Sequence, residues 1–348
     1  MKCKLSDLML PAPYGGGFEM QDYWVWCGSV VKGEDSRYHM FASRWPKTLP
    51  MHPGWLLKSE VVRASCDTAD GTYKFEEVVL PMRGAQFWDG RSTHNPHIMK
   101  INGKYVLYYT GMTYPFDDAE GEVSCSDPRV IASRASKRIG VAVSDSVFGP
   151  WKRFDSPILN TRPGSFDNFL VSNPAPCIKE NGDILLIYKS RSYKEPPYIG
   201  ELHGKMQFGA AQAQSACGEY KRISDVPLFG GFELEDPFIW RDNDGYNMMA
   251  KDMSGEICGE PMGGVYASSA DGVQWNFKKN ILFYSRKILW SDGRVREMGN
   301  LERPFMLFEN GVPSYVFFAT SDGKDGMGFA NCTKTWNMVI PLKKSEDK

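Results

Sequence analysis

The sequence lacks the features that mark several large classes of protein. The net charge of its 348 residues is −1, and basic and acidic residues are interleaved, so there is no basic excess to bind nucleic acid or an anionic membrane. No apolar run approaches the length of a membrane-spanning helix. The start, MKCKLSDLMLPAP, has neither the apolar core nor the cleavage site of a secretion signal. We therefore expect a cytoplasmic protein, or a periplasmic or secreted one if a leader has been removed.

Motifs for metals, nucleotides and redox chemistry are also missing. The eight cysteines occur singly, without a CxxC pair, which favours free thiols over disulfides. There is no HExxH, no P-loop and no dinucleotide-binding glycine motif. DNDG at 242–245 lacks the downstream glutamate of a calcium loop. We expect no cofactor and no metal ligands, and leave open a structural cation in the central channel of the fold inferred below.

What the sequence does contain is a repeated pattern of short strands. Five segments share an apolar run, a turn rich in Asn, Gly or Asp, and a β-branched or aromatic run, which is the pattern of a β-hairpin. They lie at 27–43, 95–111, 173–190, 234–252 and 303–320. Each is followed by two further strand-like runs, such as RIGVAVSD and PWKRFDSPIL after the second hairpin. The repeating unit is therefore four strands, present five times.

Four-stranded antiparallel sheets repeated around an axis form a β-propeller. The sequence predicts an all-β protein, a single five-bladed β-propeller in residues 1–348, with blades at roughly 20–81, 88–160, 167–230, 233–284 and 300–343. In the last blade, GMGFANC (326–332) is the expected third strand and TWNMVIPL (335–342) the fourth. Two polar insertions, 113–138 and 192–205, are expected to form loops over one face.

Candidate functional residues lie where the inner strands begin. The first strand of each blade lines the channel, and its start lies beside the end of the antiparallel second strand. Polar residues are concentrated at these positions, so we expect them to converge on one pocket. The strand starts carry Trp26–Cys27, His94–Asn95, Ser172–Asn173, Glu235–Asp236 and Glu302–Arg303, and the second-strand ends carry Arg44, Lys189, Lys251–Asp252 and Thr320.

A five-bladed propeller whose inner strands open with acidic-X-Pro or Asp-Pro turns resembles glycoside hydrolase family 43 and its relatives, among them arabinanases, levansucrases and invertases. The blade pattern covers nearly the whole chain, whereas the site motifs match only in part. Glu235 in LEDP stands where family 43 carries its general acid, two residues before a proline. Cys27 and Asn173 occupy the positions of the family's base and pKa modulator, and neither side chain can take those roles.

A glycosidase needs two carboxyl groups at the scissile bond, so Glu235 requires a partner. Asp22 ranks first because it falls in the blade of the family's base, Glu302 in NLERP ranks second, and Asp89 in FWDGRSTHNP ranks third. The resemblance implies inversion of configuration, which needs carboxyl groups about 6.5–9.5 Å apart, against about 5–5.5 Å for retention.

The other candidates are expected to bind the substrate or tune the acid: His94, Asn95, Asn173, Lys251, Arg303, Asp236, Asp252, Asp89, Trp26, Lys189 and Arg44. Structural roles are open for several of them. Glu302 and Arg303 are equally suited to an ion pair that closes the propeller. Asp236 and Asp252 are suited to holding Lys251 in place.

Three functions are compatible with this pattern. The first is an exo-acting glycoside hydrolase, with an oligosaccharide or glycoside as its only expected partner. The second is a glycoside phosphorylase, in which phosphate replaces the attacking water and the cations are supplied by Arg44, Lys189, Lys251 and Arg303. The third is a non-catalytic carbohydrate-binding propeller, which the two missing aspartates favour.

Overall fold

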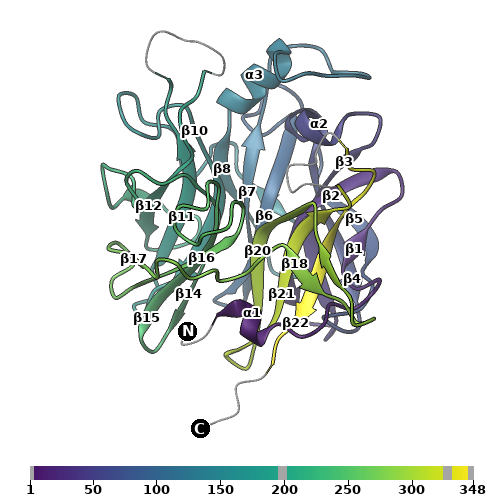
Figure 1. Ribbon diagram of the computed structural model, residues 1–348. Coiled ribbons are helices and arrows are strands. Elements are labelled where there is room, and N and C mark those ends of the chain that lie inside the picture. Colours follow the sequence, from purple (N-terminus) through teal and green to yellow (C-terminus); the bar gives the residue numbers. More distant parts are fainter. Residues whose placement is uncertain (1–3, 195–201, 324–330, 344–348) are drawn as a thin grey trace.

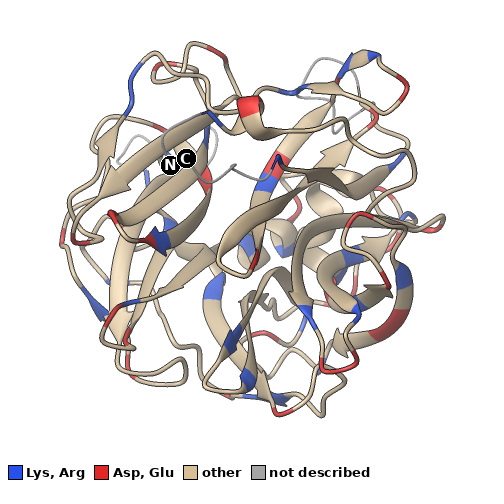
Figure 2. Cartoon of the chain, turned by 90° about the horizontal axis from the view of Figure 1, so that it is seen from below, with Lys and Arg blue, Asp and Glu red and all other residues tan. Residues whose placement is uncertain are grey.

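The computed structural model describes residues 4–194, 202–323 and 331–343. Five four-stranded antiparallel sheets surround a central channel, which confirms the predicted five-bladed β-propeller (Figure 1). Within these ranges the helices are α1 (Leu5–Leu8), α2 (Met51–Lys58) and α3 (Pro128–Ala135), and none is long and apolar enough to cross a membrane. Seen from below, acidic and basic residues are interspersed over the blades (Figure 2), as the balanced charge indicates.

The first four blades each use four strands that follow one another in the chain. The first contains β2 (Tyr23–Lys32), β3 (Tyr38–Pro46), β4 (Glu60–Cys66) and β5 (Lys74–Leu80). The second contains β6 (Ser92–Ile101), β7 (Lys104–Met112), β8 (Arg138–Ser144) and β9 (Lys152–Arg153). The third contains β10 (Leu170–Ile178), β11 (Ile184–Arg191), β12 (Gln207–Ala213) and β13 (Lys221–Arg222). The fourth contains β14 (Leu234–Asp242), β15 (Gly245–Asp252), β16 (Gly264–Ser269) and β17 (Asn276–Phe277).

The fifth blade differs from the prediction. Its inner strands are β20 (Asn300–Glu309) and β21 (Val312–Ser321), but TWNMVIPL forms the third strand, β22 (Thr335–Pro341), rather than the fourth. The outer strand is β1 (Phe18–Glu19), from the beginning of the chain. The segment predicted as the third strand, 326–332, lies mostly outside the described residues. Hydrogen bonds between β1 and β22 therefore join the two ends of the chain and close the ring.

The insertion at 113–138 is not a plain loop, because it contains α3. Asp127 caps this helix by accepting a hydrogen bond from the backbone N–H of Arg129, and Pro128 occupies the first helical position. The Ser133 hydroxyl donates to the carbonyl of Leu56, which joins α3 to α2. Together the two helices cover one end of the channel, at the top of Figure 1. A short two-stranded sheet, β18 (Lys287–Leu289) and β19 (Val295–Glu297), follows the fourth blade.

Neighbouring blades are joined by apolar packing. Between the third and fourth blades, Leu185 and Ile187 of β11 belong to the same buried cluster as Met248 and Ala250 of β15. Strands packed on both faces read as nearly continuous apolar runs, which is the pattern seen in the sequence. Buried area of this kind supplies the dominant favourable contribution to folding.

Two blades also carry a buried acidic residue in equivalent positions. Asp89, with 0% of its surface exposed, forms ion pairs with Arg83 and Arg153, at 2.7 Å each. It also accepts a hydrogen bond from the hydroxyl of Tyr109 at 2.7 Å. All of its partners belong to the second blade or its entry segment, so Asp89 holds that blade together and does not serve the channel. The prediction that placed it in the functional site is corrected accordingly.

Asp167 repeats this arrangement in the third blade. Its carboxylate pairs with Arg162 at 3.0 Å and Arg222 at 2.8 Å, and accepts from the hydroxyl of Tyr188 at 2.9 Å. Asp89 and Asp167 each lie six residues before an Asn-Pro pair in the inner strand of the blade, at Asn95 and Asn173, so the repeat was present in the sequence.

We expect Asp89→Ala and Asp167→Ala each to lower the free energy of unfolding by about 3–5 kcal/mol, because each leaves two half-buried guanidinium groups and a buried tyrosine hydroxyl without their shared carboxylate. Urea denaturation measures the change. Asp145→Ala is the matched control, since its ion pair with Lys104 is exposed and should leave stability unchanged. Wild-type stability of Asp89→Ala would contradict the structural role.

Candidate active site

All five inner strands share one backbone irregularity. Each bulges at two residues between hydrogen-bonded pairs, and the first of the two has a left-handed φ of 50–59°. In four blades the second is proline, which has no N–H to donate and therefore suits a bulge. The left-handed residues are Cys27, Asn95, Asn173, Asp236 and Arg303. Asn and Asp tolerate this conformation best, whereas Cys and Arg adopt it at a steric cost.

These five residues form a hydrogen-bonded chain across the channel, through the side chains of the first four and the backbone N–H of Arg303. Cys27 Sγ donates to Asn95 Oδ1 at 2.7 Å, and Asn95 Nδ2 donates to Asn173 Oδ1 at 2.6 Å. Asn173 Nδ2 donates to Asp236 Oδ1 at 2.7 Å, and the backbone N–H of Arg303 donates to Asp236 Oδ2 at 3.1 Å. Each donor finds an acceptor, and the chain ends on a carboxylate, which only accepts. This channel network fixes the five strand starts relative to one another.

A pocket of about 310 Å³ lies at the end of the channel that α2 and α3 cover, a volume at the lower end of the range for ligand sites. The structure brings ten of the predicted site residues into its wall: Glu235, Glu302, His94, Asn95, Asn173, Asp236, Lys251, Arg303, Trp26 and Lys189. The convergence of residues from all five blades follows from the shared bulge.

Three other predicted residues lie elsewhere. Asp22 is exposed in the bend before β2, five residues or about 16 Å of extended chain from the bulge, so its carboxylate does not reach the pocket. Arg44 is turned into the first blade, where it pairs with Glu60 at 2.8 Å. Asp252 accepts the backbone N–H groups of Ile257 and Cys258 and so shapes the loop after β15.

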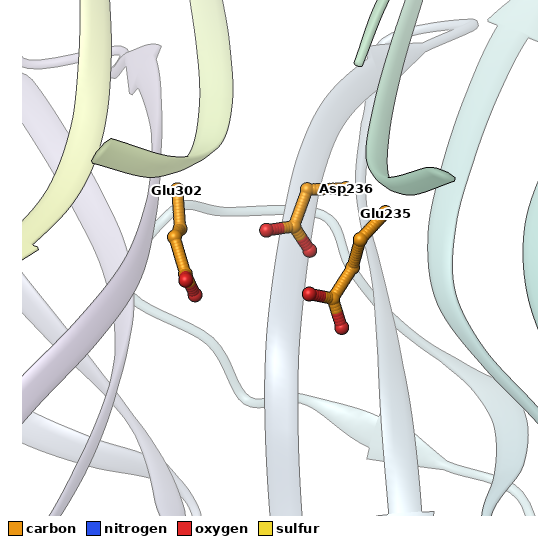
Figure 3. A group of neighbouring side chains, drawn as sticks. All are labelled: Glu235, Asp236 and Glu302. Atoms are coloured by element: carbon orange, nitrogen blue, oxygen red, sulfur yellow. The ribbon is translucent and has the colours of Figure 1, made fainter. Parts of the chain in front are cut away.

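Three carboxylates meet in the pocket. Glu235 and Asp236 stand side by side on β14, and Glu302 faces them from β20 (Figure 3), with oxygens of the three within 4.8 Å of one another. The Lys251 ammonium lies 2.8 Å from Glu235 and from Glu302 and 3.8 Å from Asp236. It takes the place that a metal ion would have among these oxygens, so the site does not fit a bound cation.

Glu235 is held in its ionised form. Burial alone would raise its pKa, but the ammonium groups of Lys189 and Lys251 both contact the carboxylate. Their attraction outweighs the burial, and the pKa of Glu235 lies well below its ordinary value. Glu235 is therefore a carboxylate at neutral pH, which is the opposite of what a general acid at this position would require.

Glu302 behaves in the opposite way. Burial raises its pKa, and Lys251 opposes the rise but is offset by the negative charges of Asp236 and Glu235. Asn300 Nδ2 donates a hydrogen bond to the carboxyl at 3.3 Å. The pocket thus contains two neighbouring carboxyl groups whose environments displace their pKa values in opposite directions, which is the pattern of an acid and its ionised partner.

An aromatic wall completes the pocket. His94 stacks on Trp55, with ring centroids 4.6 Å apart, and meets the edge of Trp45 at 5.7 Å. Its Nδ1 lies 2.8 Å from the hydroxyl of Ser59. Its Nε2 lies 3.7 Å from Cys27 Sγ. Burial and then the charge of Lys137 hold the pKa of His94 well below its ordinary value, so the ring is neutral.

Three basic residues of this pocket were not predicted from the sequence: Arg134, Lys137 and Arg191. The first two end the insertion at 113–138, which was expected to be a polar loop, and Arg191 is the last residue of β11. The available signal was the run SRASKR, a cluster of basic residues directly before the third strand of the blade.

No family model and no curated protein matches the sequence. Solved structures do match. A family 117 glycoside hydrolase of the marine bacterium Zobellia galactanivorans shares 15% identity over 94% of this chain and 88% of its own, with a TM-score of 0.65. A protein described as a glycoside hydrolase shares 15% identity over 99% and 95%, with a TM-score of 0.67. A family 43 β-xylosidase/α-arabinofuranosidase from a compost metagenome shares 15% identity over 92% of both chains, with a TM-score of 0.57.

These comparisons confirm the predicted resemblance in fold to family 43 glycoside hydrolases and their relatives, and they add a family 117 enzyme to the proteins with this fold. At 15% identity they establish the architecture alone. Function has to be argued from the pocket, because one fold supports many activities.

We expect Lys251→Met to lower the free energy of unfolding by about 3–5 kcal/mol, because the three carboxylates lose the cation between them. Calcium should then raise the melting temperature of the variant, since carboxylate oxygens are its preferred ligands, but should leave the wild type unchanged. Lys104→Met, which alters an exposed lysine, is the control for loss of one charge. Equal effects of calcium on the wild type and Lys251→Met would show that Lys251 does not occupy the cation position.

Proposed function

We propose that the protein is a glycoside hydrolase that acts in this pocket on a short oligosaccharide or a glycoside. The observation that carries the proposal is the pair Glu235 and Glu302, adjacent carboxyl groups with opposite pKa displacements. The architecture shared with several glycoside hydrolases supports it. The small pocket, partly covered by α2 and α3, favours binding of a chain end, and hence exo action.

In this proposal Glu302 is the proton donor and Glu235 the ionised partner, the reverse of the role that sequence reasoning gave to Glu235. Glu302 protonates the leaving oxygen while that bond to the anomeric carbon breaks. The Lys251 ammonium, 2.8 Å away, stabilises the carboxylate that forms on Glu302 as the proton departs. Lys189 and Lys251 keep Glu235 ionised throughout.

The spacing of the two carboxyl groups favours retention of configuration over the expected inversion. Their oxygens approach within 4.8 Å, near the roughly 5–5.5 Å of retaining enzymes and short of the roughly 6.5–9.5 Å that leaves room for an attacking water. Glu235 would attack the anomeric carbon to form a glycosyl-enzyme. Glu302, now a carboxylate, would then take a proton from the water that releases the sugar.

We expect Glu302→Gln to lower kcat/KM for aryl glycosides with poor leaving groups by roughly 10²–10⁴-fold, because no proton is supplied in the transition state. A dinitrophenyl glycoside, whose leaving group needs no proton, should lose far less. Glu235→Gln should abolish turnover of both substrates, since it removes the nucleophile. A panel of aryl glycosides provides the measurement.

The control for these variants is Glu180→Gln, whose side chain is 85% exposed and remote from the pocket. Equal activity of Glu302→Gln and the wild type on every leaving group would contradict the assigned acid. Glycoside binding without turnover of any member of the panel would establish the non-catalytic carbohydrate-binding alternative.

The pH dependence follows from the two pKa displacements. Activity requires protonated Glu302, whose pKa is raised, so kcat/KM should decline only as the pH rises above the ordinary range of a glutamic acid. Glu235, whose pKa is lowered, should remain ionised well into acid, so the acid limb should lie below that range. In Glu302→Gln, assayed with the dinitrophenyl glycoside, the alkaline limb should disappear. An unchanged alkaline limb would assign it to another group.

A further inference from the structure

The pocket contains more positive than negative charge. Its basic residues are Arg134, Lys137, Lys189, Arg191, Lys251 and Arg303, and its acidic residues are Glu235, Asp236 and Glu302. Lys189, Lys251 and Arg303 contact those carboxylates. The three remaining cations gather on one wall, formed by the end of α3, the residue before β8 and the end of β11. We call this set (Arg134, Lys137 and Arg191) the basic wall.

Lys137 is the unusual member of the basic wall. Only 3% of its surface is exposed, and its ammonium lies over the ring of Trp55, 4.2 Å from the centroid. Among the described residues the ammonium has neither an ion pair nor a hydrogen bond, although the side chain lines the pocket. A buried charge without a counter-charge is costly. Burial, followed by the like charges of Lys189 and Arg134, holds the pKa of Lys137 well below its ordinary value.

Arg134, a second member of the basic wall, also lacks a counter-charge among the residues that the structure describes. The residue lies in the last turn of α3 and is half-buried, and within the described ranges its guanidinium has no partner. Arg191 is engaged through Nη1, which lies 2.6 Å from His203 Nδ1 and donates to the carbonyl of Gly204. A guanidinium presents paired donors that match the oxygens of a carboxylate or a sulfate.

We propose that Lys137 and Arg134 bind an anionic substituent of the sugar substrate, either the carboxylate of a uronic acid or a sulfate ester. The anion would supply the missing counter-charge of Lys137. Glu235 is close enough for its charge to act on Lys137, so the substituted sugar would lie beside the carboxyl pair. This inference rests on the proposed function for the identity of the ligand as a substrate.

Binding of small charged sugars tests the inference without requiring turnover. The probes for titration calorimetry at constant ionic strength are D-glucuronate, D-galacturonate, galactose 6-sulfate and neutral galactose. We expect at least one charged sugar to bind at least tenfold more tightly than galactose, and the preferred one distinguishes carboxylate from sulfate. Lys137→Met and Arg134→Gln should each weaken that binding at least tenfold, and Lys137→Arg should restore part of it.

Lys104→Met, which removes an exposed lysine far from the pocket, should bind as the wild type does. The melting temperature of each variant establishes that it is folded, and Lys137→Met removes a buried charge while shortening the side chain by only one heavy atom. Equal binding of charged and neutral sugars, or unchanged affinity in folded Lys137→Met, would overturn the inference. Turnover that requires inorganic phosphate would overturn it too, since the basic wall would then serve a phosphate co-substrate, as in the phosphorylase alternative.

The outcomes also separate this inference from the proposed function. Hydrolysis of neutral glycosides with no preference for charged sugars would leave the hydrolase standing and remove the anion site. Charged-sugar binding that depends on Lys137, without turnover of any charged or neutral glycoside, would leave the anion site standing and remove the hydrolase.

Discussion

The hydrogen-bonded chain from Cys27 to Asp236 is the constraint on which the pocket depends. Each left-handed residue contributes to the channel network, Arg303 through its backbone N–H and the other four through their side chains, and the residue before it is then presented at the channel end. In four blades that preceding residue lines the pocket: Trp26, His94, Glu235 and Glu302. A ring closed by β1 and β22 holds the five strand starts at fixed positions. The carboxyl pair is therefore positioned by backbone geometry and network contacts, rather than by flexible loops.

Electrostatics in this pocket are unusually strong because its charges are buried. Three carboxyl groups share the Lys251 ammonium unequally, so that the pKa of Glu235 is lowered while that of Glu302 is raised. Burial gives such interactions far more weight than they have in water. The same burial makes Lys137 unusual, since its ammonium forms no ion pair with a carboxylate of the described residues. A charge that is costly in the free protein is a favourable contact once a ligand supplies its partner.

The sequence predicts much of this arrangement, because a repeated hairpin pattern and prolines after Asn95, Asn173, Asp236 and Arg303 mark equivalent positions. It does not predict how the ring closes, since a strand as short as Phe18–Glu19 has no periodic hydrophobic pattern. Asp22 was favoured by analogy with a family's blade order, but an extended strand separates it from the bulge. Arg44 and Asp252 do occur at second-strand ends. The side chain of Arg44 points into the first blade and that of Asp252 toward the loop after β15, and sequence spacing does not specify these orientations. Lys137 follows α3 directly and lines the pocket. The polar composition of its segment predicted a loop rather than a helix, so this position was not predicted.

We expect the neighbouring carboxyl groups of Glu235 and Glu302 to titrate on opposite sides of the ordinary glutamate range, and carbon-13 NMR of glutamate side-chain carboxyls measures this directly. Spectra of the wild type, recorded from acid to alkaline pH and assigned with Glu235→Gln and Glu302→Gln, should show one resonance titrating well below the ordinary glutamate range and another above it. The first should be absent from Glu235→Gln and the second from Glu302→Gln. Ordinary titration of both groups, near a pKa of about 4.3, would contradict the account.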